Sequence, residues 1–217
     1  MLKFLCRGSG FSGENNAAYV EVGEDLILID CGYTVFNAIR EKLDLAKYNN
    51  VYIIITHLHP DHAGSLGQQI MYMRYVLNKK PHILSICEKM QKYLGACGVD
   101  RKFYFLKESC PYNIKFIKTT HSEFLDAYGF SLEINGKKIV YTGDTATLEP
   151  FEKHIEGAYE LYVDVSKNGV IHLKIDEVFE KLIAIQNGGT KVFLMHLDDE
   201  EYISRVVQGM LEFAKLA

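Results

Sequence analysis

The hydrophobic residues of the chain follow strand spacing in some segments and helical spacing in others. Three short β-rich segments, residues 2–5, 18–22 and 26–30, are separated by glycines, and this pattern predicts an opening β-meander. Residues 35–45 then have helical spacing, and residues 51–56 form an almost unbroken β-branched run. Such a run predicts a strand that is buried on both faces.

Strand and helix patterns continue to alternate along the rest of the chain. Asn135-Gly136 predicts the turn of a hairpin between residues 130–134 and 138–141, because both residues accept the positive φ of a tight hairpin turn. This alternation predicts an α/β (α+β) fold. The other predicted helices cover residues 63–77, 88–94, 175–184 and 200–216, and the other predicted strands cover residues 82–86, 103–105, 114–118, 161–164 and 192–195.

Length and composition narrow the class of protein. A chain of 217 residues predicts a single domain over residues 1–217 with a core large enough to fold without disulfides. The 48% hydrophobic and 24% charged residues are typical of a soluble globular protein. A net charge of -4 argues against a stable nucleic-acid partner, which normally needs a concentrated basic surface.

Membrane insertion and disulfide bonding are not expected. No window reaches the length of a membrane span, and the apolar start at residues 1–5 is too short for a signal peptide. The five cysteines are an odd number without Cys-x-x-Cys spacing, so we expect reduced thiols. These features predict a cytoplasmic protein with no membrane partner.

Four metal-binding side chains follow the strand predicted at residues 51–56. His57, His59, Asp61 and His62 lie within six positions of one another, at a strand-to-helix turn that lets all four point into one pocket. Neutral imidazole and carboxylate suit Zn²⁺, and also Mn²⁺ or iron when these are available. The sequence therefore predicts a metal site at this strand end.

Three further candidates each follow an apolar β-rich segment, so all are expected at strand ends. They are His121, Asp144 and His196, and Asp144 has two oxygens with which it could bridge two ions. Single histidines such as His82 and His154 are expected to be structural residues. The clustering of five of the eight histidines at strand ends favours a metal centre over scattered structural roles.

The order of these seven residues resembles the ligand signature of the metallo-β-lactamase superfamily. The resemblance implies a four-layer αββα sandwich with two metal ions and places Asp30 in a supporting role behind the metal loop. One ion would bind His57, His59, His121 and the bridging Asp144. The other would bind Asp61, His62, His196 and the same Asp144.

Two ions roughly 3.5–4 Å apart activate a bridging hydroxide, which predicts a metal-dependent hydrolase. The segment after His121 lacks the His-Thr-Pro-Gly-His turn typical of thioesterase-like members. Residues 128–130 and 141–145 are instead similar to the ribonuclease Z and phosphodiesterase branch. We therefore expect a phosphodiesterase.

Asp164 and His172 resemble the acidic residue and catalytic histidine of that branch. A departing alkoxide needs a proton, and an imidazole oriented by a carboxylate can supply it as a general acid. His172 could instead pack beside the following helix, with Asp164 as a turn residue. The candidate catalytic residues are thus Asp61, Asp164 and His172.

Only 22 residues separate His121 from Asp144, which leaves no room for the long tRNA-binding arm of ribonuclease Z. A small phosphodiester, either a cyclic nucleotide or a short nucleotide, is therefore the expected substrate. The loop at residues 7–12 could contact a phosphate through its backbone N–H groups. The aromatic-rich segment at residues 70–76 and the resemblance to related phosphodiesterases predict a homodimer.

Three other functions use the same ligands. A thioesterase or lactonase would direct the hydroxide at a carbonyl and leave His172 without a role. A di-iron redox or oxygen-sensing protein would be coloured and would contain iron. A binding module with a degenerate site would keep its biological activity after loss of the metal.

Overall fold

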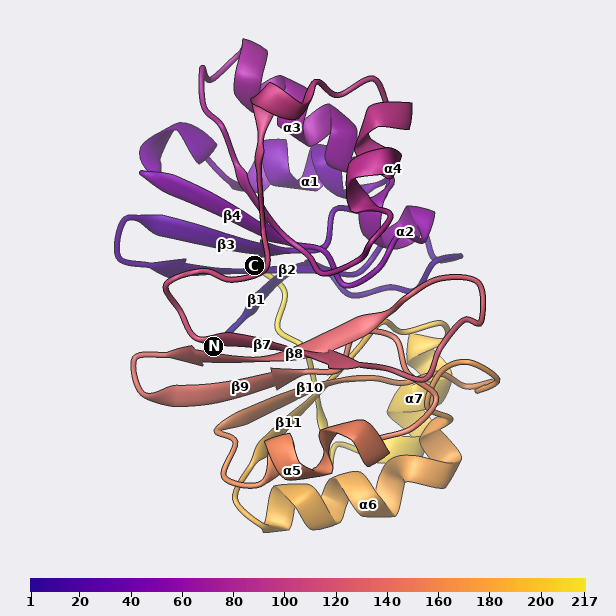
Figure 1. Ribbon diagram of the computed structural model, residues 1–217. Helices are drawn as coiled ribbons and strands as arrows, with labels where there is room; N and C mark the ends of the chain where they lie inside the picture. Colours follow the sequence, from indigo (N-terminus) through magenta and orange to yellow (C-terminus); the bar gives the residue numbers. More distant parts are fainter. The chain divides into compact units, whose positions relative to one another are not determined.

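The chain forms two compact units, and each unit is built on one six-stranded sheet. The computed structural model describes residues 1–217 (Figure 1). One unit comprises residues 2–110 and 215–217, and the other comprises Met1 and residues 111–214. We call them the N-terminal and C-terminal units. Both combine a sheet with helices, which confirms the predicted α/β class, whereas the single domain expected over residues 1–217 stays a prediction.

The sheet of the N-terminal unit has the strand order β1-β2-β3-β4-β5-β6. Its first three strands pair antiparallel, as the predicted meander requires, and the remaining pairs are parallel. Residues 51–56 are buried throughout, so the strand predicted there is indeed covered on both faces. The strands are β1 Lys3–Cys6, β2 Ala17–Val22, β3 Asp25–Ile29, β4 Asn50–Ile54, β5 His82–Leu84 and β6 Phe105–Lys107.

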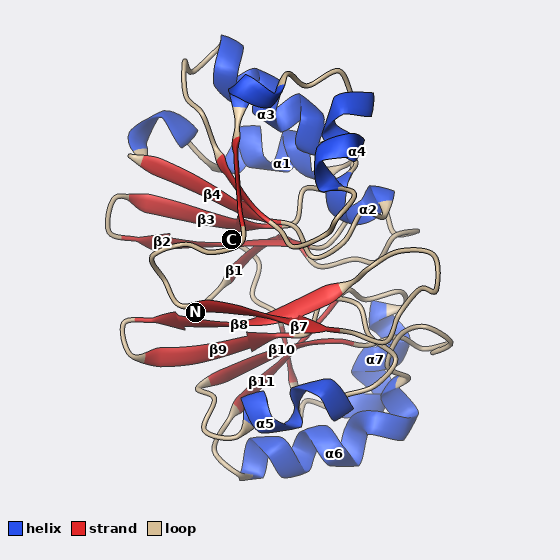
Figure 2. Cartoon of the chain, in the orientation of Figure 1, coloured by secondary structure: helices blue, strands red, loops and turns tan.

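Helices α1, α3 and α4 lie together on one face of this sheet (Figure 2). The helix predicted for residues 63–77 is present as α3 but is shorter, because it covers only residues 66–75. A separate short helix, α2, precedes it, and Pro60 occupies the first turn of α2, where its fixed φ suits the helix. The elements are α1 Val35–Lys42, η1 Leu45–Lys47, α2 Pro60–Ala63, α3 Leu66–Tyr75, α4 Met90–Ala96 and η2 Arg101–Phe103.

The strand predicted at residues 103–105 is also wrong in position. The Asp100 side chain accepts a hydrogen bond from the backbone N–H of Lys102 at 2.9 Å, which stabilises the 3₁₀ turn η2. A short polar side chain that bonds the backbone in this way competes with strand formation. The strand β6 therefore begins only at Phe105.

The sheet of the C-terminal unit has the order β12-β11-β10-β9-β8-β7. The predicted hairpin is formed by β8 and β9, and Asn135 and Gly136 have φ values of 52° and 71°, as this tight turn requires. From β9 to β12 the pairs are parallel. The strands are β7 Ile114–Lys118, β8 Tyr128–Ile134, β9 Lys137–Tyr141, β10 Glu160–Asp164, β11 Lys191–Met195 and β12 Glu212–Phe213.

Helices α5, α6 and α7 cover one face of this second sheet, and their apolar side chains share a core with it (Figure 2). The helix predicted for residues 200–216 is wrong beyond Val207, because Gln208 and Gly209 have φ values of 49° and 77° and end it. The chain then forms β12 beside β11. No helix is both long and apolar enough to span a membrane. The helices are η3 Glu149–Phe151, α5 Glu152–Ile155, α6 Ile175–Asn187 and α7 Glu200–Val207.

Candidate metal centre

The first group of predicted ligands lies on the connection between β4 and α2 in the N-terminal unit. His59 has an extended backbone, with ψ at 151°, and Pro60 then begins the helix. Asp61 and His62 follow in the first turn of α2, where the backbone N–H of His62 donates to His59 O at 3.0 Å. The strand-to-helix turn predicted for this motif is therefore confirmed.

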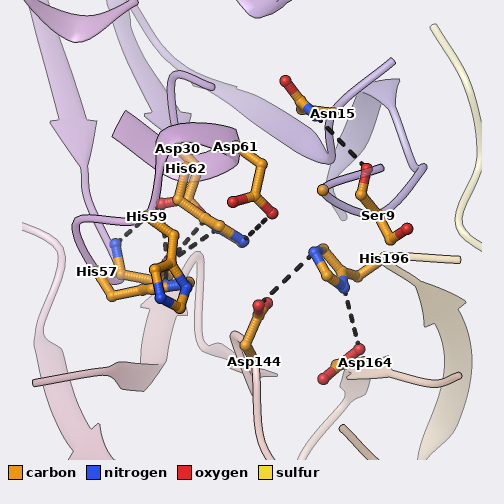
Figure 3. Close-up of polar contacts among 12 residues, drawn as sticks. Ser9, Asn15, Asp30, His57, His59, Asp61, His62, Asp144, Asp164 and His196 are labelled. Carbon is orange, nitrogen blue, oxygen red and sulfur yellow. Dashed lines mark hydrogen bonds and ion pairs between the residues drawn. The ribbon is translucent and has the colours of Figure 1, made fainter. Parts of the chain in front are cut away.

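Asp30 and Thr56 orient the histidines of this turn, and Figure 3 shows Asp30 beside His62. The buried Asp30 carboxylate accepts hydrogen bonds from Thr56 Oγ1 at 3.0 Å and from the Thr56 backbone at 2.9 Å. Its other oxygen lies 2.8 Å from His62 Nδ1. Since the one hydroxyl proton of Thr56 goes to Asp30, His57 Nδ1 is the donor in its 3.1 Å bond to Thr56 Oγ1.

The remaining nitrogen of each ring approaches another predicted ligand. His57 Nε2 lies 3.0 Å from His59 Nδ1, and His62 Nε2 lies 3.2 Å from Asp61 Oδ2. Asp30 has the supporting role expected from the sequence. Thr56 was not identified as part of the site, although its position directly before His57 was a usable signal.

In the C-terminal unit, Asp144 lies in the turn that follows β9 and is almost fully buried. Its Oδ2 atom is 3.7 Å from His121 Nε2 and 3.6 Å from His196 Nε2. Figure 3 shows the contact between Asp144 and His196. One carboxylate oxygen thus faces two imidazole nitrogens that come from different strand ends.

Asp164, the last residue of β10, contacts two histidines at once. Its Oδ2 atom lies 2.8 Å from His172 Nδ1 and also accepts a hydrogen bond from the backbone N–H of Thr145 at 3.1 Å. Its Oδ1 atom lies 3.2 Å from His196 Nδ1. The sequence paired Asp164 with His172 but missed His196. The signal was the parallel pairing of β10 with β11, which aligns Asp164 with Met195, the residue before His196.

His172 is surrounded by the other polar residues of this unit. Its ring centroid is 5.2 Å from that of His121 and 5.0 Å from that of His196. One ligand-type atom from each of Asp144, Asp164, His172 and His196 lies within 4.8 Å of the others. Burial lowers the pKa of the His172 imidazole, but the charge and hydrogen bond of Asp164 outweigh this effect, so the pKa is raised above its ordinary value.

Four of the five predicted histidine ligands share one arrangement. Their Nδ1 atoms lie 2.8–3.2 Å from an oxygen of their own unit, which holds the proton on Nδ1 and leaves the lone pair on Nε2. The acceptor for His121 is the carbonyl of Ile171, which can only accept. Histidines that bind metals are normally oriented in this way, so the residues fit a divalent ion. The four are His57, His62, His121 and His196.

Solved structures with the same arrangement of elements define the class of this fold. The chain matches the metallo-β-lactamase fold protein YhfI from Bacillus subtilis with a TM-score of 0.78 and 16% identity, over 100% of this chain and 95% of that one. Human short-form tRNase Z gives a TM-score of 0.68 at 16% identity, over 92% of this chain and 93% of its own. The chain therefore has the metallo-β-lactamase fold.

Comparison of the sequence finds similarity to further proteins. The family model described as Anti-Pycsar protein Apyc1 matches residues 1–97. Proteins of that name from Bacillus phage 010DV004 and Paenibacillus sp. (strain J14) are 25% and 26% identical to this chain, over 98% and 99% of its length and 95% and 96% of theirs. A diphosphatase of the PhnP family shares the fold, with a TM-score of 0.69 and 17% identity, over 100% of this chain and 95% of that one. The predicted metallo-β-lactamase fold is confirmed.

Proposed function

We propose that the chain is a metal-dependent phosphodiesterase that acts on a small phosphodiester, either a cyclic nucleotide or a short nucleotide. The observation that carries this proposal is the common orientation of the four histidines, which leaves each Nε2 lone pair available to a divalent ion. The similarity to a tRNase Z and to a diphosphatase supports phosphoryl chemistry over the cleavage of thioesters or lactones.

The proposed centre would hold two ions. Substitution of each of the seven predicted ligands tests this part of the proposal. Imidazole and carboxylate donors suit Zn²⁺, with Mn²⁺ or iron as the alternatives. His57, His59, His121 and Asp144 would hold one ion. Asp61, His62, His196 and the same Asp144 would hold the other.

The ions would supply an activated water and Lewis acidity towards the phosphoryl oxygens. His172, oriented by Asp164, supplies the proton that the leaving group needs. Because Asp164 binds Nδ1 of His172, the proton that can be transferred is on Nε2. The protonated imidazole donates this proton to the departing alkoxide, and the Asp164 carboxylate stabilises the charged ring before the transfer.

The short connection between His121 and Asp144 supports a small substrate. The 22 intervening residues contain all of β8 and β9, so more than half of them belong to the sheet itself. A long arm for gripping a folded nucleic acid is therefore absent from this position. A mononucleotide-sized phosphodiester needs no such arm.

We also propose that the enzyme is a homodimer. Ile70 and Met73 of α3 are buried, whereas Tyr75 and Val76 at its end are 71% and 64% exposed. Exposed apolar side chains at the end of an otherwise packed helix favour contact with a second copy. A monomeric mass in light scattering would contradict this proposal.

The test of the function is a substrate screen on protein loaded separately with Zn²⁺, Mn²⁺ and Fe²⁺. We expect hydrolysis of phosphodiesters, including nucleoside cyclic monophosphates, which a chelator abolishes and added metal restores. Asp144→Ala is the matched inactive control, because it removes the carboxylate that faces two histidines and should reduce the bound metal measured by elemental analysis.

The same screen distinguishes the alternatives. Turnover of thioesters or lactones with no cleavage of phosphodiesters would replace this function by the carboxylic hydrolase. Bound iron with an oxygen-dependent visible absorbance would favour the di-iron redox protein.

A further inference from the structure

A tight turn at residues 9–12 presents one fully exposed aromatic ring. The backbone N–H of Ser12 donates to Ser9 O at 3.1 Å, and the backbone N–H of Ser9 donates to Ser12 Oγ at 3.1 Å. Gly10 and Phe11 are therefore the central residues of the turn. The relative exposure of Phe11 is 106%, the highest among the large hydrophobic residues.

This turn is packed directly against the metal-binding loop of the same unit. A Cβ atom placed on Gly10 would lie only 2.8 Å from Asp61 Oδ2, so the turn approaches this carboxylate closely. The Tyr33 hydroxyl donates to Gly10 O at 3.1 Å, and the Tyr33 backbone N–H donates to Pro60 O at 3.0 Å. Tyr33 thus ties the turn and the metal loop together.

Asn15 fixes the other end of the turn. Its side-chain nitrogen donates to Ser9 O at 3.5 Å, a contact drawn in Figure 3. Its side-chain oxygen accepts hydrogen bonds from the backbone and hydroxyl of Thr34 at 3.2 Å and 3.1 Å. Asn15 is itself completely buried. Polar contacts from Asn15 and Tyr33 therefore position the turn, and burial of the Phe11 ring contributes nothing to it.

The position of Phe11 near the metal loop suits a ligand with a flat group that can stack on its ring. Its Cα atom is about 3.8 Å from that of Gly10, which lies close to the Asp61 carboxylate, a proposed metal ligand. A molecule whose phosphate reaches the metals therefore has its remaining groups close to this ring. The group that suits a flat, exposed aromatic face is a nucleobase, because every base has a face that stacks on such a ring.

We propose that Phe11 is the platform on which the base of a nucleotide substrate stacks. This inference rests on the proposed phosphodiesterase function and adds the element that selects nucleotides over other phosphodiesters. Phe11 takes no part in bond cleavage, so its effect is on substrate binding. A substrate without a base gains nothing from it.

The kinetic test compares Phe11→Ala with the unaltered enzyme on two substrates. For a nucleoside 3′,5′-cyclic monophosphate, kcat/KM should fall by roughly 5- to 100-fold, the loss expected for one stacked base, with the change mainly in KM. For methyl p-nitrophenyl phosphate, which has no base, it should stay the same. Phe124→Ala is the matched control, because Phe124 is 87% exposed on a loop and should affect neither substrate.

A second test measures binding without catalysis. The chain contains no tryptophan, so Phe11→Trp introduces a single tryptophan, whose emission can be excited selectively, at the proposed platform. Stacking of the base should quench its emission when a nucleoside 5′-monophosphate is added to metal-loaded protein, and Phe124→Trp should show no change. Phe11→Trp should also retain the activity that Phe11→Ala loses.

The outcomes separate this inference from the function on which it rests. Suppose that the unaltered enzyme cleaves phosphodiesters. If Phe11→Ala then changes kcat/KM equally for both substrates, the platform is wrong and the phosphodiesterase function stands. The same conclusion follows if the emission of Phe11→Trp is unchanged by a nucleotide that inhibits turnover. If no phosphodiester is cleaved at all, both proposals fail. Emission that changes with protein concentration alone would assign Phe11 to contact with a second copy and overturn the platform.

Discussion

The N-terminal unit takes its predicted ligands from one short turn, whereas the C-terminal unit takes them from three separate strand ends. In the first, β4 and α2 place four side chains within residues 57–62. In the second, His121, Asp144 and His196 follow three different strands, and the sheet must form before they meet. One half of the ligand set is therefore a local feature and the other depends on tertiary structure.

The two units also differ in how they orient their histidines. In the N-terminal unit, the Asp30 carboxylate contacts Nδ1 of His62 directly. It acts on His57 only through Thr56, whose hydroxyl oxygen accepts a hydrogen bond from His57 Nδ1. In the C-terminal unit, the Asp164 carboxylate directly contacts Nδ1 of both His172 and His196. A single substitution should therefore cause more damage in the C-terminal unit, and this difference can be measured.

The largest effect is expected for Asp164→Asn. It should lower phosphodiester turnover by more than roughly a hundredfold through His172 and weaken metal binding by about 10- to 100-fold through His196. The matched variant Asp30→Asn should weaken metal binding by a similar factor but leave the rate of the metal-saturated enzyme much closer to the original. Metal titration and turnover at saturating metal measure both. Equal losses of metal affinity and of turnover in the two variants would contradict the proposed difference between the two units.

A smaller effect is expected for His172→Ala. Loss of the general acid should reduce turnover of a phosphodiester by roughly a hundredfold while the metal content stays the same. The loss should be least for substrates with a good leaving group, such as p-nitrophenolate, because that group departs without a proton. An unchanged rate on a nucleoside cyclic monophosphate would return His172 to a packing role beside α6.

The smallest effect concerns stability and lies in the N-terminal unit. Hydrogen bonds from Tyr48 and Lys47 lower the pKa of the Glu21 carboxyl to about 2. Since this value is below the unfolded one of about 4.3, the contribution to stability is present above that pH and is lost as the pH falls towards 2. Glu21 is partly exposed, so Glu21→Gln should cost about 1 kcal/mol or less at pH 7 and almost nothing at pH 2. Denaturant unfolding at the two pH values is the measurement.

The local character of the first ligand group explains why the sequence predicted it so directly. A buried β-branched strand followed by His57, His59, Asp61 and His62 leaves few alternatives for the direction of those side chains. The contact between Asp164 and His196 was missed because it depends on the neighbouring places of β10 and β11 in the sheet. Sheet order is set by packing over the whole unit and is not encoded in any one segment.

The errors in the secondary-structure prediction also arise from tertiary contacts, which no single segment of the sequence encodes. Residues 200–216 contain enough apolar spacing to suggest one helix, and no proline interrupts them. The left-handed conformation of Gln208 and the pairing of β12 with β11 redirect the chain, and both reflect tertiary contacts. In contrast, Asn135-Gly136 was predicted correctly because its conformation is a property of those two residues.

The pairing of β1 with the last residues of the chain has a consequence for the order of folding. Phe4 donates through its backbone N–H to Lys215 O at 2.9 Å and accepts from the Ala217 backbone N–H at 2.8 Å. These partners are about 200 residues apart, so the contact closes a very long loop and is expected to form late. During synthesis, the outer edge of β1 therefore stays unpaired until the other strands have been synthesised. In this period the unpaired edge favours edge-to-edge association of the nascent chain with other chains.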